Sequence, residues 1–206
     1  MPHSDFDCQL FLMDLGNVLV KFDHGILARD LAKLSGRPIM AIVSQFISSG
    51  LGELYDRGKI SSEEFLSEVI KSLKLPLGAE ELKNLWCNIF SENPGMESLV
   101  ERIKRKYPIW VISDTNELHF EYVKEKFSVL RLVDGFILSY QVGELKPHPR
   151  LFEEALRRSR SEASKTFFAD DRGELVRAAS KLGFHAFRFR DAASFEKELS
   201  RLALLD

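Results

Sequence analysis

Short apolar runs that stop at polar turn residues recur along the chain, and each of them predicts a buried strand. The first run, at residues 9–13, is followed at once by Asp14 and by the loop-forming pair Gly16-Asn17. A parallel strand that is buried on both faces has this continuously apolar character. Four more runs of the same kind predict strands at 109–112, 135–138, 166–169 and 185–189.

Helical periodicity separates these strands in the second half of the chain. Amphipathic helices are predicted at 96–106, 117–127, 149–159, 174–182 and 194–202. Strands that alternate with helices of this length imply right-handed crossovers and a parallel sheet that is covered on both faces. The pattern therefore predicts an α/β fold built on a parallel sheet.

Residues 23–92 break the alternation, because their pattern is almost wholly helical. The third of the predicted helices has the clearest start, with Ser61 followed by acidic residues in the first turn and by apolar residues at helical spacing. No alternating β-branched run occurs in this block, so no strand is predicted there. We expect the block to be an insertion near the edge of the sheet where α/β folds bind ligands. Its helices are predicted at 25–35, 40–48, 61–73 and 80–90.

Composition and charge exclude several classes of function. A net charge of −2 over 206 residues produces no field that would recruit nucleic acid or an anionic membrane. The chain has no apolar run of 18 residues, and its start lacks the pattern of a secretion signal. The two cysteines, Cys8 and Cys87, lack metal-type spacing and are predicted to be buried thiols in a reducing compartment. We therefore expect a cytoplasmic protein without nucleic-acid or membrane partners.

Polar residues of complementary chemistry follow three of the predicted strands. Asp14 follows the first strand, Ser113 the second, and the pair Asp170-Asp171 the fourth, while Lys146 stands before a proline at the start of a helix. The carboxyl ends of parallel strands meet at one crevice. Carboxylates gathered there repel one another unless a cation lies among them, and oxygen-only ligation suits Mg²⁺. A lysine and a hydroxyl beside such a metal suit a phosphoryl group, with an ionised aspartate as nucleophile.

The order of these segments resembles the haloacid dehalogenase-like (HAD) hydrolase superfamily, and within it the branch that contains bacterial α-D-glucose-1-phosphate phosphatases. The resemblance covers nearly the whole chain. It implies a Rossmann-like core at residues 1–20 and 95–206, with a small helical C1-type cap inserted at 21–94. The segments that carry it are Asp14-Leu-Gly-Asn-Val, Val111-Ile-Ser113-Asp-Thr-Asn, Lys146-Pro, Phe168-Ala-Asp170-Asp171, and the stretches 54–65 and 115–119.

The resemblance also implies catalytic and substrate-binding roles. Asp14 would be the nucleophile that forms an aspartyl-phosphate. Ser113 would hold a phosphoryl oxygen, and Lys146 would neutralise both Asp14 and the transferring group. Asp114 and Asn116, next to Ser113 in the same segment, are expected to complete the substrate-binding set.

A magnesium site is implied in the same way. The backbone carbonyl of Gly16 would join Asp14 and Asp171 around Mg²⁺. Asp170 would ligate the ion directly or through a water molecule. The metal would screen charge that otherwise repels the attacking carboxylate.

Gly16 departs from the pattern of the superfamily, because most of its phosphatases carry a second aspartate at this position. That aspartate protonates the leaving oxygen and later activates water, which is typically worth about 10²–10⁴-fold in rate. The glucose-1-phosphate branch has the same glycine. A leaving group of low basicity needs less protonation, which favours sugar 1-phosphates or other activated phosphates as substrates. Asp23, His24 and His119 are candidate substitute acids, although each fits a structural or solvated role better.

A second departure follows the acidic pair. Leu175 stands where family members often have an asparagine, which bears only on the fine geometry of the metal site. Arg172 and Glu174 fill the same loop, and both are expected to be solvated charges.

The leading hypothesis is a Mg²⁺-dependent phosphatase that acts on a small phosphorylated metabolite. Two alternatives remain. A 2-haloacid dehalogenase uses a similar aspartate without a metal, and the pair Asp170-Asp171 argues against it. A non-catalytic protein that binds a phosphorylated ligand or a protein partner is suggested by Gly16 and Leu175. In either enzyme, specificity is expected to lie in the cap and in the loop after the first strand.

Overall fold

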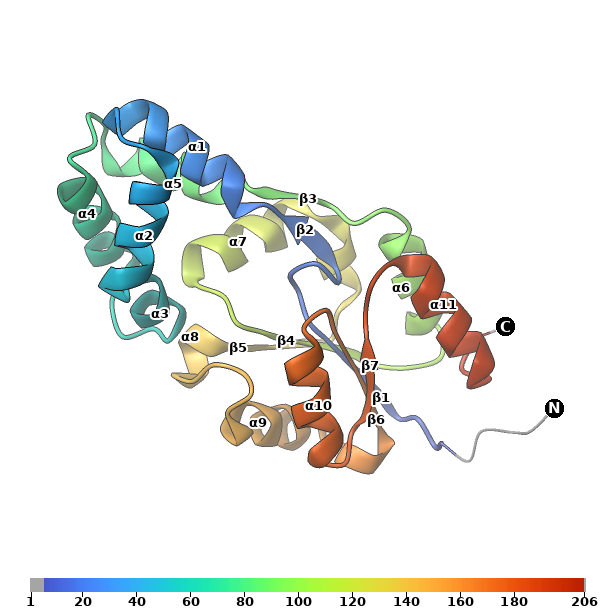
Figure 1. Cartoon of the computed structure of the whole chain (residues 1–206). Helices are drawn as coiled ribbons and strands as arrows, with labels where there is room; N and C mark the ends of the chain where they lie inside the picture. Colours follow the sequence, from blue (N-terminus) through green and yellow to red (C-terminus); the bar gives the residue numbers. More distant parts are fainter. Residues whose placement is uncertain (1–5, 206) are drawn as a thin grey trace.

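Five parallel strands form the sheet at the centre of the protein, and helices cover both of its faces (Figure 1). The structure, a computed structural model, describes residues 6–205. The order of the strands in the sheet is β5-β4-β1-β6-β7, which confirms the predicted α/β fold with a Rossmann-like parallel sheet. The strands are β1 (Leu10–Met13), β4 (Ile109–Ser113), β5 (Gly135–Leu138), β6 (Thr166–Asp170) and β7 (His185–Arg188).

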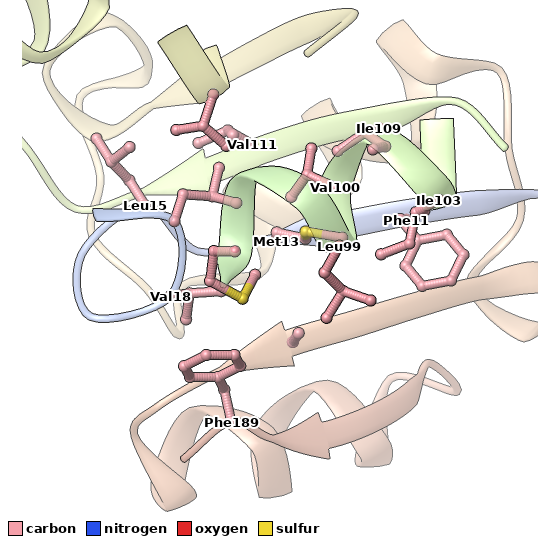
Figure 2. Close-up of a cluster of buried hydrophobic side chains, with 14 of the residues drawn as sticks. Phe11, Met13, Leu15, Val18, Leu99, Val100, Ile103, Ile109, Val111 and Phe189 are labelled. Carbon is pink, nitrogen blue, oxygen red and sulfur yellow. The ribbon is translucent and has the colours of Figure 1, made fainter. Parts of the chain in front are cut away.

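The central strand β1 sends its side chains alternately into two separate hydrophobic cores. Phe11 and Met13 belong to the core on one face, and Leu12 belongs to the core on the other. All three residues are fully buried, as expected for a strand with partners on both sides and helices on both faces. Figure 2 shows the first core, in which Leu99 and Val100 pack beside β1.

The helices that follow the strands divide between these two faces. Side chains of α6, α7 and α11 enter the first core, and side chains of α9 and α10 enter the second. The bounds are α6 (Met96–Lys104), α7 (Glu117–Lys126), α8 (Ser139–Val142), α9 (Pro149–Ser159), α10 (Gly173–Lys181) and α11 (Ala192–Arg201), with 3-10 turns at Ser128–Leu132 and Ala163–Lys165.

The remaining five helices, here called the cap helices, share a third hydrophobic core that includes Tyr55, Phe65 and Trp86. They lie at the carboxyl ends of the strands, and a short antiparallel ribbon of β2 and β3 joins them to the sheet (Figure 1). The division of the chain into a core and a cap at the predicted boundaries stays a prediction. The elements are α1 (His24–Ser35), α2 (Ile39–Ser49), α3 (Leu51–Asp56), α4 (Ser62–Leu73), α5 (Ala79–Cys87), β2 (Val20–Phe22) and β3 (Phe90–Glu92).

The expectation that residues 23–92 contain no strand was wrong at the carboxyl-terminal end of this block. The helix predicted at 80–90 ends at Cys87, and Phe90 belongs to strand β3, which pairs with β2. Each of these strands is three residues long, too short to show an alternating pattern, and its partner lies about 70 residues away. The helix α4, in contrast, begins as predicted, because Ser61 and Glu64 form a reciprocal capping box.

Both cysteines are free thiols, with Cys87 buried and Cys8 partly exposed. Burial raises the pKa of Cys87 to about 11 and that of Cys8 to about 12, so neither is an activated nucleophile. Within residues 6–205, the helices are all too short or too polar to span a lipid bilayer.

Candidate active site

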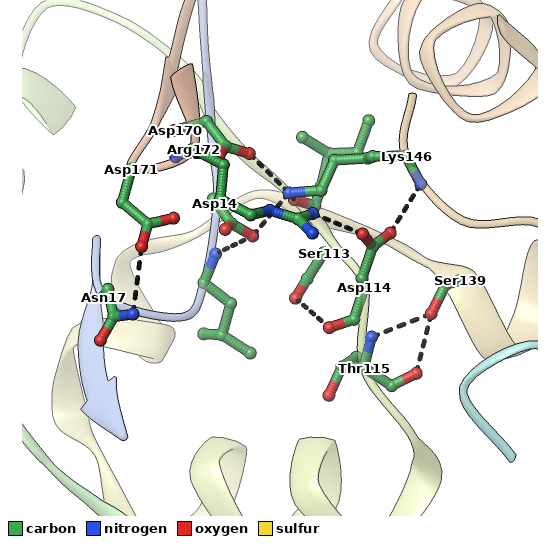
Figure 3. Close-up of polar contacts among 12 residues, drawn as sticks. Asp14, Asn17, Ser113, Asp114, Thr115, Ser139, Lys146, Asp170, Asp171 and Arg172 are labelled. Carbon is green, nitrogen blue, oxygen red and sulfur yellow. Dashed lines mark hydrogen bonds and ion pairs between the residues drawn. The ribbon is translucent and has the colours of Figure 1, made fainter. Parts of the chain in front are cut away.

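The carboxyl ends of three neighbouring strands bring the predicted catalytic and metal-binding residues together (Figure 3). Asp14 directly follows β1, Ser113 ends β4, and Asp170 ends β6 with Asp171 next to it. Lys146 comes from the loop between α8 and α9 and reaches the same point. The convergence follows from the parallel sheet, which places the ends of adjacent strands at one edge.

Lys146 is the centre of the polar contacts. Its Nζ atom lies 2.8 Å from Oδ1 of Asp14 and 2.7 Å from Oδ2 of Asp170. It also donates a 3.3 Å hydrogen bond to the carbonyl of Ile112. Burial favours the neutral amine, but the carboxylates of Asp14 and Asp170 outweigh it and raise the pKa of Lys146. The side chain is therefore a fixed cation between two buried carboxylates.

Asp14 is held so that one carboxylate oxygen is oriented by the protein. Its Oδ1 accepts a hydrogen bond of 2.8 Å from the amide of Leu15, in addition to the contact with Lys146. Burial raises the pKa of Asp14 to about 7, and the nearby carboxylate of Asp170 adds to this shift while Lys146 opposes it. A further cation beside Asp14 would favour its ionised form.

Asp14, Asp170 and Asp171 each offer a carboxylate oxygen, and these oxygens all lie within 4.8 Å of one another. Asn17 donates a 3.1 Å hydrogen bond to Asp171 and fixes the most exposed of the three. Three carboxylates and Lys146 leave two negative charges uncompensated. Hard oxygen ligands and this charge fit a divalent cation such as Mg²⁺. These three residues could therefore hold the metal that the sequence predicts.

Both carboxylate oxygens of Asp114 bind other residues of the protein and help to position them. One carboxylate oxygen accepts a 2.7 Å hydrogen bond from the backbone amide of Lys146, and the other lies 2.6 Å from a guanidinium nitrogen of Arg172. The backbone amide of Arg172 also donates to Asp170. Arg172 is an exposed charge, as predicted, but its ion pair with Asp114 was not predicted. Asp114 lies 58 residues away in the sequence, and no local pattern reveals this contact.

A cavity of about 160 Å³ separates these strand ends from the cap helices. Gly16, Ser113 and Asp114 line it from the sheet, while Asp56 and Trp86 line it from the cap. The hydroxyl of Ser113 makes only a long contact of 3.5 Å with the next carbonyl, which leaves it able to bind a ligand in the cavity. Residues of the cap helices therefore form one wall of this cavity, and predicted site residues such as Ser113 and Asp114 form another.

An adjoining groove of about 270 Å³ lies between α1 and α2. It shares the lining residues His24, Phe46 and Trp86 with the first cavity, so the two spaces lie next to each other. Apart from His24, the side chains that line the groove are apolar.

The missing aspartate at position 16 has a structural explanation. A Cβ atom on Gly16 would lie 2.6 Å from Cε1 of Phe22, closer than non-bonded carbon atoms approach. The ring of Phe22 belongs to β2 and packs on His24, with ring centroids 4.9 Å apart. The space that a side chain at position 16 would need is therefore taken by an aromatic ring.

Of the three candidate substitute acids, His24 and His119 line the cavity and Asp23 does not. Asp23 caps α1 by accepting a hydrogen bond from Gly25, and it pairs with Arg29 on the surface. His24 lines the cavity, and desolvation lowers its pKa, which favours the neutral ring.

His119 is buried, and both of its ring nitrogens already have partners. Nε2 lies 3.0 Å from the carbonyl of Trp86, so this nitrogen carries the proton, and Nδ1 accepts from Asn116 at 3.3 Å. Burial lowers the pKa of His119 to about 3. The ring is therefore neutral and committed to structural hydrogen bonds.

Asn116 links the start of α7 to the cap helices. Its Oδ1 accepts from the backbone amide of His119 and caps α7, and its Nδ2 donates a 2.9 Å hydrogen bond to Asp56. The predicted substrate-binding role of Asn116 stays a prediction. Asp56 lies in the stretch 54–65, which carries part of the family resemblance, but no role was predicted for it.

A family model for haloacid dehalogenase-like hydrolases matches residues 8–183. The chain belongs to this family. The predicted superfamily and the hydrolase class are therefore confirmed. The narrower resemblance of this HAD-like hydrolase to glucose-1-phosphate phosphatases stays a prediction.

Two curated relatives of this HAD-like hydrolase are phosphatases. A D-ribitol-5-phosphate phosphatase of Bacteroides thetaiotaomicron is 25% identical over 92% of this chain and 95% of its own length. A sesquiterpene phosphatase of Aspergillus oryzae is 25% identical over 76% of this chain and 81% of its own length.

Solved structures share the fold at low sequence identity. A HAD family enzyme of Bacteroides thetaiotaomicron, crystallised with magnesium, has a TM-score of 0.83 at 22% identity over 95% of this chain and 99% of its own. The same enzyme was also crystallised with magnesium and inorganic phosphate. An L-2-haloacid dehalogenase has a TM-score of 0.64 at 16% identity over 86% of this chain and 82% of its own.

Proposed function

We propose that this HAD-like hydrolase is a Mg²⁺-dependent phosphatase of a small phosphorylated metabolite, with Asp14 as its nucleophile. The observation that carries the proposal is the contact of buried Lys146 with both Asp14 and Asp170, beside a group of three carboxylates. A lysine fixed in this way can compensate the charge of a phosphoryl group. The phosphatase activity of two relatives supports the same reaction class.

The residues have distinct roles in the proposed reaction. A carboxylate oxygen of Asp14 attacks phosphorus, the bond from phosphorus to the leaving oxygen breaks, and an aspartyl-phosphate forms. Lys146 compensates the charge on Asp14 and on the phosphoryl oxygens, and Ser113 donates a hydrogen bond to one of them. Magnesium, when bound by Asp14, Asp171 and the Gly16 carbonyl, with Asp170 directly or through water, would screen the repulsion between the two anions. Water then hydrolyses the intermediate.

Phosphate release from a panel of esters tests this proposal. We expect turnover with Mg²⁺, loss of turnover in EDTA, and a fall of more than ~10³-fold in kcat for Asp14→Asn. Asp30→Asn, a change of the same kind on α1 of the cap, should keep wild-type activity. Absence of phosphate release from every ester, by folded protein with Mg²⁺, would contradict the proposal.

The dehalogenase alternative is weaker because its chemistry gains nothing from a cation site. The oxygens of Asp14, Asp170 and Asp171 lie close enough together to share one ion. Release of chloride from chloroacetate in the presence of EDTA would favour a dehalogenase over a phosphatase. The cytoplasmic location and the lack of nucleic-acid partners stay predictions of the sequence.

Two classes of leaving group compete. Sugar 1-phosphates remain the first candidate, because Gly16 removes the usual acid and an anomeric oxygen is a good leaving group. Esters of apolar alcohols are the second candidate, because an apolar groove lined by residues such as Leu27 and Ile42 lies next to the cavity. The sesquiterpene phosphatase among the relatives fits the second candidate. The ratio of kcat/KM for glucose 1-phosphate to that for a branched C10–C15 alkyl phosphate distinguishes the two.

A further inference from the structure

The cavity of this hydrolase is lined by a carboxylate, Asp56, that has no role in the site described above. Phe22 closes the position of the usual general acid at Gly16, yet the reaction of an ordinary ester still needs a proton for its leaving oxygen. We propose that Asp56, carried by the cap helices, is the general acid and base of the reaction. The inference rests on the proposed phosphatase function.

Asp56 is the last residue of α3 and lines the cavity together with Gly16, Ser113 and Asp114. Its Oδ1 accepts a hydrogen bond of 2.9 Å from Nδ2 of Asn116. Its Oδ2 has no hydrogen-bond partner within residues 6–205. In this part of the chain every side-chain oxygen or nitrogen that solvent cannot reach does have a partner, so solvent can reach Oδ2. Oδ2 is therefore open to the cavity and can carry the proton that is transferred.

Each residue of the segment 55–58 contacts α7, α8 or the residues beside them. Arg57 forms an ion pair and Tyr55 accepts a hydrogen bond of 3.2 Å from a backbone amide of α7. Gly58 lies so close to the backbone that a Cβ atom there would be 2.1 Å from a carbonyl oxygen. A cap segment held in this way gives its carboxylate a defined position, which general acid catalysis requires. The contacts join Tyr55 to Leu118, Asp56 to Asn116, Arg57 to Glu144 and Gly58 to Tyr140.

The charges around Asp56 favour its acid form. Burial raises the pKa of Asp56 to about 6, the hydrogen bond from Asn116 opposes this shift, and the carboxylates of Asp114 and Glu53 add to it. The two histidines that face the cavity, His24 and His119, have lowered pKa values and do not supply positive charge. Asp56 therefore keeps its proton to a higher pH than an ordinary aspartate does.

The proposed proton transfers balance in both steps. When Asp14 attacks phosphorus, the bond to the leaving oxygen breaks, and Oδ2 of Asp56 gives that oxygen its proton, so that an alcohol leaves and Asp56 becomes a carboxylate. In the second step Asp56 takes a proton from water as the water oxygen attacks phosphorus. The bond between phosphorus and Asp14 then breaks, and inorganic phosphate and the two starting residues are restored.

Leaving-group dependence tests this role, because only a proton donor acts more strongly on poor leaving groups. For Asp56→Asn we expect kcat/KM on alkyl phosphates to fall by about 10²–10⁴-fold. On p-nitrophenyl phosphate, whose leaving group needs no proton, the fall should be less than about tenfold. Asp30→Asn is the matched control on the cap surface, and His24→Gln tests a second titratable group that lines the cavity.

The pH profile provides a second readout. With wild-type protein, kcat/KM for an alkyl phosphate should fall above about pH 6 relative to that for p-nitrophenyl phosphate, as Asp56 loses its proton. The difference between the two substrates should vanish in Asp56→Asn.

Three outcomes would overturn the inference while leaving the phosphatase itself established. They are an equal loss on alkyl and aryl phosphates in Asp56→Asn, wild-type activity in that variant, and a selective loss on alkyl phosphates in His24→Gln instead. The first would mean that Asp56 only positions the cap. If the wild-type protein hydrolyses none of the esters, the proposed function fails, and this inference fails with it.

Discussion

The ring of Phe22 limits which side chains fit at position 16. The ring is anchored by contacts with His24 and Phe90, at centroid distances of 4.9 and 6.3 Å. Its edge fills the space in front of the Gly16 Cα atom. An acid at position 16 would therefore require the ring of Phe22 to move, whatever the substrate requires.

Gly16→Asp should destabilise the protein even though it restores the usual residue of the family. Because the new side chain overlaps Phe22, we expect the free energy of unfolding to fall by about 1–3 kcal/mol. In a Phe22→Ala background the same substitution should cost less, with a coupling of about 0.5–3 kcal/mol. Urea unfolding of the two single variants and of the double variant measures this. An equal cost in both backgrounds would show that the ring does not exclude the side chain.

Residues that follow strands could be predicted from the sequence, whereas residues that depend on partners from distant segments could not. Asp14, Ser113 and Asp170 were placed correctly because each stands at the end of an apolar run, and parallel strand ends converge. The contacts of Arg172 and of Asp56 were missed. Their partners, Asp114 and Asn116, lie about 60 residues away, and no spacing rule connects them.

Among the elements, the five strands of the sheet and most helices were predictable because each is a distinct apolar run or a periodic segment. The ribbon of β2 and β3 was not, since its stability comes from the pairing of two three-residue segments at opposite ends of the cap helices. The helix α3 was missed for a related reason. It has six residues, too few to show helical periodicity, and packing against α2, α4 and α8 supports it.

The turn after α3 requires glycine for two separate reasons. Gly58 has a φ of +61°, and a Cβ atom there would lie 2.1 Å from the carbonyl oxygen of Tyr140. Gly36, at the end of α1, has a similar φ of +65° but no atom within 4 Å of a Cβ. The two positions share the backbone conformation and differ in the close contact, so they form a matched pair.

Gly58→Ala should therefore cost more than Gly36→Ala. We expect Gly36→Ala to lower the free energy of unfolding by about 1 kcal/mol, from backbone strain alone. Gly58→Ala should lower it by about 2–4 kcal/mol, because the segment must also move away from Tyr140. If Asp56 acts as proposed, kcat on an alkyl phosphate should fall in Gly58→Ala only. Thermal unfolding and steady-state kinetics measure both effects, and equal results for the two variants would contradict the role of the contact.

At the scale of the whole molecule, polar contacts beside the cavity join the cap helices to α7, the helix that follows β4. These contacts of Asn116 and His119 are here called the seam. His119 of α7 donates to the carbonyl of Trp86 in α5, and Asn116 bonds to both His119 and Asp56. The ring of His119 also stacks on Trp86, with centroids 4.8 Å apart. A neutral histidine is therefore built into the contact between the two parts, and protonating it would break one of its hydrogen bonds.

Acid should weaken this seam through His119. Its pKa falls from 6.5 to about 3 on folding, so between these values the unfolded chain binds more protons and stability decreases as the pH falls. From pH 7 to pH 5 this residue should cost about 2 kcal/mol of unfolding free energy. His119→Gln, which cannot titrate, should be less stable than wild type at pH 7 but lose about 2 kcal/mol less on going to pH 5. Asp56 has a raised pKa in the folded protein, so its contribution to stability increases as the pH falls. Both proteins contain Asp56, so the difference between their urea unfolding curves reports the effect of the histidine alone. An identical pH dependence in both would show that His119 is not the acid-sensitive group of the seam.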